Sequence, residues 1–315
     1  MKKMMQPPGR QLFALALLSL ILFSGCSQNQ RSSSSKITSS LPPVSQSEAS
    51  SELSSDLSSA LETSLLISSS EAAPSSKPAI SSTKPTVSSA LPTAPTGATA
   101  GAVPASAKAG MSYFDDAVFV GDSVSLKLKL YAAKMRQSNA DFFGKAQFLV
   151  QGSMGSGNAL QPVSSTSIHP SYNGEKMALE DSIAKMGAKK VYIMLGMNDI
   201  AVYGIDGSVK NMGTLIDRIK AKSPNAVILV QSATPMIQTM QRKELNNKNM
   251  YLYDQKLAAL CVQNGWHFID VAEVMRDKNG ALPVNYCSDP QILGMHFTDT
   301  ACQVWTDYLL THTVR

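Results

Sequence analysis

Residues 117–123 read Ala-Val-Phe-Val-Gly-Asp-Ser, a short apolar run that ends in a glycine, an acid and a serine. Such a run, bounded by Gly and Asp, indicates a buried strand. The apolar residues that follow, from Leu126 to Met135, recur three and four positions apart, which is the period of a helix with one buried face. The stretch therefore predicts a strand that turns directly into a helix, with Ser123 at the junction.

The same alternation of strand and helix repeats along the chain. Four more apolar runs read as buried strands, at Gln147 to Val150, Val191 to Leu195, Val227 to Val230 and Trp266 to Ile269. Helical periodicity is found at Met177 to Met186, Val209 to Ile219 and Leu252 to Cys261, and in a last helix that Thr298 caps. Because parallel neighbours need crossover connections, the pattern predicts a three-layer α/β/α fold with a flavodoxin-like parallel sheet of about five strands.

The chain before this domain begins like an exported protein. Residues 1–26 contain basic residues, then an apolar run, then small residues, which is the layout of a secretory signal. The apolar run is too short to span a bilayer comfortably. Ser24 and Gly25 directly before Cys26 resemble a bacterial lipobox, although Phe23 replaces the usual Leu. We expect a bacterial lipoprotein with Cys26 lipidated, and an ordinary secretory signal that is cleaved nearby is the alternative.

Residues 27–110 are rich in Ser, Thr, Ala and Pro and poor in large apolar side chains. Such a segment cannot bury enough apolar surface to offset its ordering entropy, so we expect a disordered tether. A tether of roughly eighty residues has a root-mean-square span of about 50 Å. It would carry the domain from the extracytoplasmic face of the cell membrane into the cell wall. Residues 111–315 are then enough for one domain with a single core.

Charge and cysteine content narrow the possible partners. The net charge of +5 lies partly in the signal segment, and the acids and bases of the tether balance, so no nucleic acid partner is expected. The cysteines after Cys26 are Cys261, Cys287 and Cys302, without a CxxC pair or the Cys/His spacing of a zinc site. We expect no metal. Cys287 and Cys302 flank His296, and either a disulfide between them or buried free thiols fit.

Three polar motifs follow three of the predicted strands. They are Gly-Asp-Ser at 121–123, Gln-Gly-Ser-Met-Gly-Ser-Gly at 151–157 and Leu-Gly-Met-Asn-Asp at 195–199. Each motif alone fits a helix cap or a turn. In an open parallel sheet, however, functional groups gather at the carboxyl ends of the strands. The three motifs together therefore predict one site at this edge of the sheet.

These blocks resemble those of the SGNH hydrolase family, also called GDSL esterases and lipases, over essentially all of residues 111–315. The family's blocks are GDS, a Gly-containing loop, GxND and a late DxxH. The resemblance implies that Ser123 is the nucleophile. It also implies that the Ser123 N–H, the Gly155 N–H and the Asn198 side chain hold the oxyanion. Gly152 is the alternative position in the loop, and Asp199 is expected to fix the Asn198 loop.

The general base is expected among four histidines, His169, His267, His296 and His312. Only His296, in the loop before the last helix, occupies the position of the family's histidine. The block reads Leu293-Gly294-Met295-His296, with Leu293 where the family has its orienting carboxylate. Two interpretations fit: Asp289, a few residues earlier, orients the imidazole, or a backbone carbonyl does so.

These residue types suit acyl transfer. A hydroxyl is a poor nucleophile until a base takes its proton, and preorganised donors stabilise the oxyanion that follows. No cofactor is required. We therefore expect a serine esterase that hydrolyses small, acetyl-type esters, with cell-wall or environmental glycans suggested by location alone. O-acetyl transfer is one alternative, and a non-catalytic glycan-binding module that keeps the fold is another.

Overall fold

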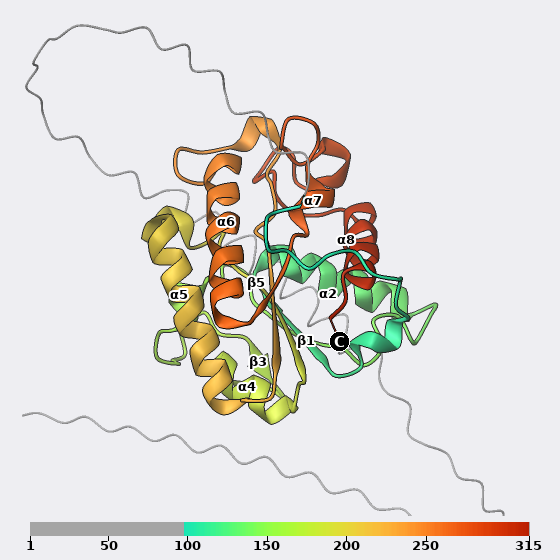
Figure 1. The fold of residues 1–315 in the computed structure, drawn as a ribbon, viewed down its shortest axis with the longest axis vertical. Coiled ribbons are helices and arrows are strands. Elements are labelled where there is room, and N and C mark those ends of the chain that lie inside the picture. The colour runs from blue at the N-terminus through green and yellow to red at the C-terminus, as the bar shows by residue number, and fades with distance from the viewer. Residues whose placement is uncertain (1–97, 315) are drawn as a thin grey trace, which may run out of the picture. The chain divides into compact units, whose positions relative to one another are not determined.

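The computed structural model describes residues 98–314, and its centre is one parallel sheet (Figure 1). The sheet contains β1 (Ala117–Gly121), β2 (Gln147–Val150), β5 (Lys190–Met194), β6 (Val227–Gln231) and β7 (His267–Ile269). Their order is β2-β1-β5-β6-β7, and all neighbours pair in parallel. This is the doubly wound order in which the chain reverses direction after its second strand. The predicted five-stranded, flavodoxin-like sheet is confirmed.

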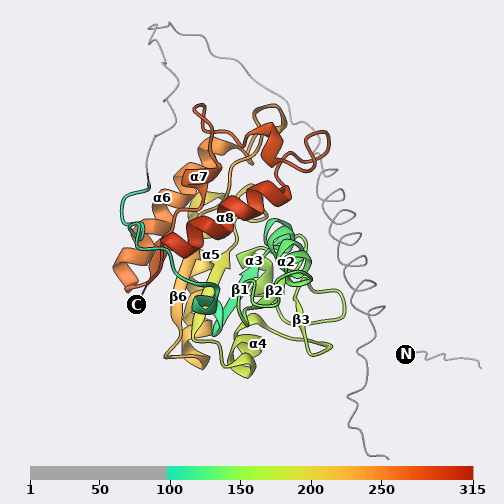
Figure 2. The ribbon, with the colours of Figure 1, turned by 90° about the vertical axis from the view of Figure 1, so that its right-hand side faces the viewer.

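Helices cover both faces of the sheet, which makes three layers. On one side α2 (Ser123–Arg136) packs against α8 (Asp299–Thr311), and on the other α5 (Ile200–Lys222) packs between α4 (Leu179–Met186) and α6 (Asn247–Asn264) (Figures 1 and 2). The short elements are α3 (Ser156–Ala159), α7 (Ala272–Met275), the 3-10 helices Met111–Phe114, Gln238–Met240 and Val284–Tyr286, and the hairpin β3 (Ser171–Tyr172) and β4 (Glu175–Lys176). The predicted helices are all present.

The core holds the sheet rigidly beneath its functional edge. Phe119 of β1 and Tyr192 of β5 stack with ring centroids 4.6 Å apart, and Phe114 stacks on Phe143 at 4.9 Å. These side chains are almost completely buried. Each buried aromatic side chain contributes on the order of 1.5–3 kcal/mol relative to an exposed one. The central strands β1 and β5 are therefore firmly fixed, and so is the position where β1 ends.

The folded domain starts earlier than the sequence predicted. Thr99 donates from its backbone N and its hydroxyl to Asp270 Oδ2, at 2.8 and 2.6 Å. Ala102 forms a parallel bridge with Phe268, and the Val103 N–H donates to the Phe268 carbonyl at 2.8 Å. These residues extend the edge of β7. The predicted boundary between residues 110 and 111 is wrong, because residues 98–110 join the domain through backbone pairing that leaves no apolar period in the sequence.

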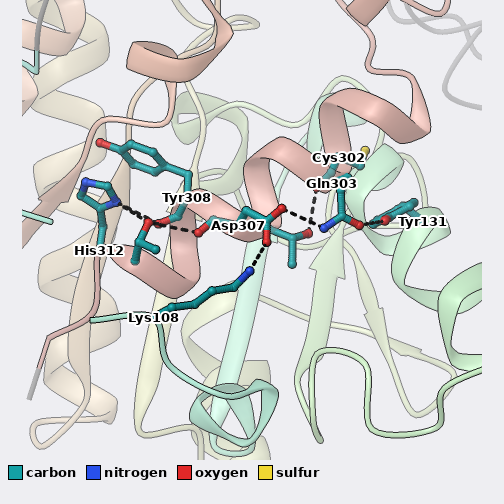
Figure 3. Close-up of polar contacts among 9 residues, drawn as sticks. Lys108, Tyr131, Cys302, Gln303, Asp307, Tyr308 and His312 are labelled. Carbon is teal, nitrogen blue, oxygen red and sulfur yellow. Dashed lines mark hydrogen bonds and ion pairs between the residues drawn. The ribbon is translucent and has the colours of Figure 1, made fainter. Parts of the chain in front are cut away.

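The end of this segment runs along α8, as Figure 3 shows. Lys108 Nζ pairs with Asp307 Oδ1 at 2.6 Å, and Asp307 Oδ2 accepts a hydrogen bond from Gln303 Nε2 at 3.0 Å. Gln303 Oε1 in turn accepts the hydroxyl hydrogen of Tyr131 on α2. The segment, α8 and α2 are thus linked by one row of polar side chains.

The predicted signal, Cys26 and most of the predicted tether lie outside the described residues. Within residues 98–314, no helix is both long and apolar enough to cross a membrane. Cys261, Cys287 and Cys302 are buried free thiols. Of the two interpretations for Cys287 and Cys302, the structure therefore has the free thiols and not the disulfide.

Candidate active site

Ser123 is the first residue of α2, directly after β1. A Cβ atom at Gly121 would lie 2.0 Å from Ser125 Oγ and 2.9 Å from the Met194 carbonyl oxygen, so only glycine fits where the chain leaves the sheet. Asp122 caps the helix, because its Oδ1 accepts the Val124 N–H at 2.9 Å. The turn thus presents Ser123 at the carboxyl edge of the sheet, as the sequence predicted.

His296 lies between Ser123 and Asp289. Its Nε2 is 2.8 Å from Ser123 Oγ and its Nδ1 is 2.7 Å from Asp289 Oδ2. All three side chains are buried. Because an ionised carboxylate can only accept a hydrogen bond, Nδ1 carries the imidazole hydrogen and donates it to Asp289. Nε2 is then unprotonated and accepts the hydrogen bond from the serine hydroxyl. Of the two predicted ways to orient the imidazole, the structure has the carboxylate of Asp289.

A small hairpin brings Asp289 to His296 across seven positions. Cys287 and Phe297 form an antiparallel bridge, and the Ser288 N–H donates to the His296 carbonyl at 2.8 Å. The Thr298 N–H donates to the Tyr286 carbonyl at 2.9 Å, which closes the base of the hairpin. Residues 286–298 therefore bring a carboxylate to His296 through a longer turn than the family's DxxH block. Leu293, at the family's carboxylate position, is instead a buried apolar residue.

The loops after β2 and β5 are joined by Asp199. This fully buried carboxylate accepts the N–H groups of Ser156 and Gly157, each at 2.8 Å, and the Ser156 hydroxyl at 3.0 Å. Asn198 Nδ2 donates to the Met154 carbonyl at 3.1 Å and to Asp122 Oδ2 at 3.3 Å. Asp199 thus holds the glycine-rich loop in place, and Asn198 ties that loop to the Ser123 turn. All three predicted motifs meet at this edge.

Comparison with known families agrees with this geometry. The model of the GDSL-like lipase/acylhydrolase family matches residues 147–304, just over half of the chain. This chain belongs to that family. The matched stretch contains Asn198, Asp289 and His296, whereas Ser123 precedes it.

Solved structures resemble this GDSL-like domain at low identity. A GDSL-like lipase from Bacteroides thetaiotaomicron is 16% identical, with a TM-score of 0.46 over 64% of this chain and 87% of the other. An acetyl-xylooligosaccharide esterase variant from Geobacillus is 13% identical, with a TM-score of 0.43 over 61% and 90%. The periplasmic domain of a Salmonella lipopolysaccharide acetyltransferase is 13% identical, with a TM-score of 0.42 over 60% and 80%. No curated protein matches the sequence.

The predicted oxyanion donor Gly155 is engaged elsewhere in this GDSL-like domain. Its N–H donates to Asn158 Oδ1 at 2.8 Å. A Cβ atom at Gly155 would lie 2.8 Å from both carboxylate oxygens of Asp199, so packing alone already requires this glycine. The alternative, Gly152, lines a pocket together with the loop from Thr166 to His169. The role of either N–H group in binding an oxyanion stays a prediction.

Two carboxyl groups beside His296 have opposite electrostatics. Burial raises the pKa of Asp122 to about 6, although the Val124 N–H and the charge of His296 oppose the shift. Burial also acts to raise the pKa of Asp289, but hydrogen bonds from His296 and Cys287 outweigh it and hold that pKa below its ordinary value. Asp289 is therefore ionised at neutral pH. The contact from Cys287 was not anticipated, because nothing in the spacing of Cys287 and Asp289 signals it.

The other histidines of the GDSL-like domain lie apart from Ser123. His169 is buried, with its ring nitrogens 3.0 Å from Ser167 Oγ and 3.2 Å from the Ala159 carbonyl oxygen. His267 begins β7, and His312 stacks on Tyr308 at 3.7 Å (Figure 3). Between residues 98 and 314, no group of three or more His, Cys, Asp or Glu side chains is arranged to hold a metal ion.

Proposed function

We propose that this GDSL-like domain is a serine esterase for small, acetyl-type esters, with Ser123 as nucleophile, His296 as general base and Asp289 as the residue that orients it. One observation carries the proposal: the imidazole of His296 lies within hydrogen-bond distance of both a hydroxyl and an ionised carboxylate, at 2.8 and 2.7 Å. A nucleophile, a base and an orienting acid in that sequence are the parts of a hydrolytic triad.

Acylation begins when His296 Nε2 takes the hydroxyl proton of Ser123. The Oγ atom then forms a bond to the ester carbonyl carbon, and the carbonyl oxygen becomes an oxyanion. When the intermediate collapses, the bond to the alcohol oxygen breaks and that oxygen takes the proton from His296 Nε2. The alcohol leaves, and the acyl group remains on Ser123. Asp289 stays ionised and stabilises the imidazolium between the two transfers.

Deacylation repeats these steps with water. His296 takes a proton from water, the resulting oxygen attacks the acyl carbon, and Ser123 leaves with the proton that His296 returns to it. The products are a carboxylic acid and the free enzyme. A sugar hydroxyl in place of water would give O-acetyl transfer by the same steps, and an acceptor sugar in the assay distinguishes the two outcomes by product analysis.

One donor for the oxyanion lies at the start of α2 in the structure as it stands. The first N–H groups of a helix have no partner within the helix, which leaves the Ser123 N–H for a ligand. The Asn198 amide lies at the same edge, but both of its hydrogens are donated, to the Met154 carbonyl and to Asp122 Oδ2, so it becomes a second donor only when one of these hydrogen bonds is released. Each such donor is typically worth about a hundredfold to a thousandfold in rate. Gly155 becomes a third donor only when its N–H leaves Asn158.

The substrate and the location rest on the chain's first residues. The export signal, the lipobox cysteine Cys26 and the Ser/Thr/Pro/Ala-rich segment favour a domain anchored by lipid on the extracytoplasmic face of the membrane. Acetyl groups on cell-wall or environmental glycans are the esters within reach there. Replacing Cys26 by Ala should move the full-length protein from the membrane fraction to the soluble fraction. Retention of the variant in the membrane would contradict the lipid anchor.

Hydrolysis of p-nitrophenyl acetate by the full chain tests the proposed reaction. Turnover should be lost in Ser123→Ala and in His296→Ala, because each removes a step that the other residues cannot supply. His267→Ala is the matched control, since this histidine lies at the amino end of β7, whereas Ser123 lies at the carboxyl edge of the sheet. Equal turnover in Ser123→Ala and wild type would contradict the proposal. Acetate release from acetylated xylan and from acetylated wall polymer then tests whether the substrate is a glycan.

A further inference from the structure

The carboxylate of Asp289 is held by more than His296. Its Oδ1 accepts three hydrogen bonds, from Cys287 Sγ at 3.2 Å, from the Met295 N–H at 3.2 Å and from the His296 N–H at 3.1 Å. Its Oδ2 is left for His296 Nδ1 at 2.7 Å. One oxygen is thus anchored, and the other faces the base.

The three anchors come from both sides of the hairpin. Met295 and His296 lie on the side that returns to Phe297, whereas Cys287 lies two residues before Asp289 on the other side. Cys287 is also bridged to Phe297 and is 5% exposed. Its thiol is the only side-chain donor to Oδ1 among the described residues. Without it, Asp289 Oδ1 is held only by the backbone N–H groups of Met295 and His296.

The thiol is suited to donate. Burial raises the pKa of Cys287 to about 12, the backbone N–H of Asp289 opposes this shift, the Asp289 carboxylate adds to it, and the charge of Lys127 opposes it. The sulfur is therefore protonated at neutral pH, and an S–H group facing an ionised carboxylate donates to it. The charged or titratable groups that act on this hydrogen bond are Asp289, His296 and Lys127.

We propose that Cys287 is a positioning residue, whose thiol fixes Asp289 Oδ1 so that Oδ2 faces His296 Nδ1. It acts through Asp289 and does not touch the substrate. The proposal deepens the esterase function and rests on it. It also accounts for how a carboxylate seven positions before the histidine, in a hairpin in place of a short turn, keeps a fixed orientation.

Removing the donor should slow turnover without weakening binding. Because S–H is a weak donor to a charged acceptor, we expect Cys287→Ala to lower kcat on p-nitrophenyl acetate roughly threefold to tenfold with KM unchanged. Cys287→Ser, which keeps a donor, should recover most of the rate. Cys261→Ala is the matched control, since it removes another buried thiol from α6, away from the hairpin. If Cys287→Ala does not fold, Cys287→Val removes the donor and keeps the site filled with apolar atoms, although its side chain is larger than the thiol.

A double-mutant cycle separates positioning from packing. In an Asp289→Ala background, adding Cys287→Ala should change kcat by less than about twofold, because the group that the thiol positions is gone. An equal loss in both backgrounds would mean that Cys287 acts through packing, and would overturn the proposal. The cycle is read on folded protein, checked by circular dichroism and melting temperature.

Proton NMR of the His296 Nδ1 hydrogen tests the positioning independently of turnover. A hydrogen shared between an imidazole and a carboxylate resonates far downfield, and we expect this signal in wild type and Cys287→Ser but weakened or shifted in Cys287→Ala. An unchanged signal in Cys287→Ala would overturn the positioning role. If wild type shows the signal and its dependence on Cys287 but hydrolyses no ester, the esterase function fails while the positioning contact stands.

Discussion

Two buried acidic sites of this domain behave in opposite ways. Asp289 accepts hydrogen bonds on both oxygens, and its pKa lies below the ordinary value despite burial. Asp254 and Asp270 lie against Arg276, whose Nη2 is 3.7 Å from an oxygen of each. Those two oxygens, Asp254 Oδ2 and Asp270 Oδ1, have no hydrogen-bond donor among the described residues.

The pKa of Asp254 reflects this environment. Burial and the charge of Asp270 raise its pKa well above the ordinary value, and Arg276 offsets this only in part. At Asp254, burial and a second carboxylate thus outweigh Arg276 and the Ala233 N–H, whereas at Asp289 the hydrogen bonds from His296 and Cys287 outweigh burial. The hairpin at Asp289 keeps its carboxylate ionised. The Asp254 site instead joins α6 to Asp270 at the end of β7, and Asp270 also accepts hydrogen bonds from Thr99.

The largest effect should come from exchanging carboxylate for amide at these two sites. Asp289→Asn should lower kcat by about 10³- to 10⁴-fold, because the amide favours the wrong imidazole tautomer. Asp254→Asn should leave kcat within about twofold of wild type, since it lies outside the triad and only its charge is removed. Steady-state hydrolysis of p-nitrophenyl acetate by both variants checks this. Comparable losses in the two variants would erase the distinction between the sites.

Removing the arginine should affect stability and not chemistry. Arg276→Ala leaves two buried acids without their ion-pair partner. Breaking a buried ion pair typically costs about 3–5 kcal/mol, and the raised pKa of Asp254 should lower this cost, because protonation removes one of the two buried charges. Urea unfolding at pH 7.5 measures the loss, and kcat per folded molecule should be unchanged. A loss below about 1 kcal/mol would mean that the acids are already neutral.

The pH dependence of stability distinguishes raised from lowered pKa values. The pKa of Asp122 is about 6 in the folded protein, against an ordinary value of 3.8, so the folded state binds the proton more tightly and stability falls as pH rises between these values. Asp122→Asn removes this fall, which amounts to on the order of 3 kcal/mol. Urea midpoints of wild type and Asp122→Asn at pH 4 and pH 8 test it. Parallel pH profiles would contradict the raised value.

Asp289 should make stability depend on pH with the opposite sign. Because its folded pKa is depressed, it contributes stability above its unfolded value that is lost as pH falls through the folded one. Asp289→Asn should therefore destabilise the domain at pH 7 more than at pH 3.

An exposed ion pair should matter least. Lys108 and Asp307 are 2.6 Å apart, but both side chains are about half exposed. Lys108→Ala should cost less than about 1 kcal/mol, and the cost should shrink in 0.5 M salt. Thermal unfolding at two salt concentrations measures it. A larger, salt-insensitive loss would show that the contact of residues 98–110 with α8 depends on this lysine.

The sequence predicted the parts of the molecule that carry a periodic signal. The five strands, the helices around them and the position of Ser123 and Asn198 at one edge follow from apolar period and motif order, whereas the choice of His296 follows from the resemblance to the family. Two features of the structure could not be predicted from apolar period or motif order. The hairpin that brings Asp289 to His296 rests on a single bridge between Cys287 and Phe297, which leaves no period to detect. Residues 98–110 join the domain through backbone pairing, which is independent of side-chain type, and through isolated polar contacts of Thr99 and Lys108, which follow no period.

The Gly155 prediction shows a different limit. The resemblance assigns the Gly155 N–H to the oxyanion, whereas in the structure this N–H is donated to Asn158 Oδ1. The structure also gives a reason for glycine at this position, the close approach of the Asp199 carboxylate, and this reason depends on a side chain from a distant loop.

The most direct test of the central claim is the intact mass of the protein after reaction with a fluorophosphonate. We predict a single covalent adduct on Ser123, located by peptide mapping, with no adduct on Ser123→Ala and much slower labelling of His296→Ala. A folded wild-type protein that takes up no adduct, or takes it up on another serine, would contradict the assignment of Ser123 as an activated nucleophile.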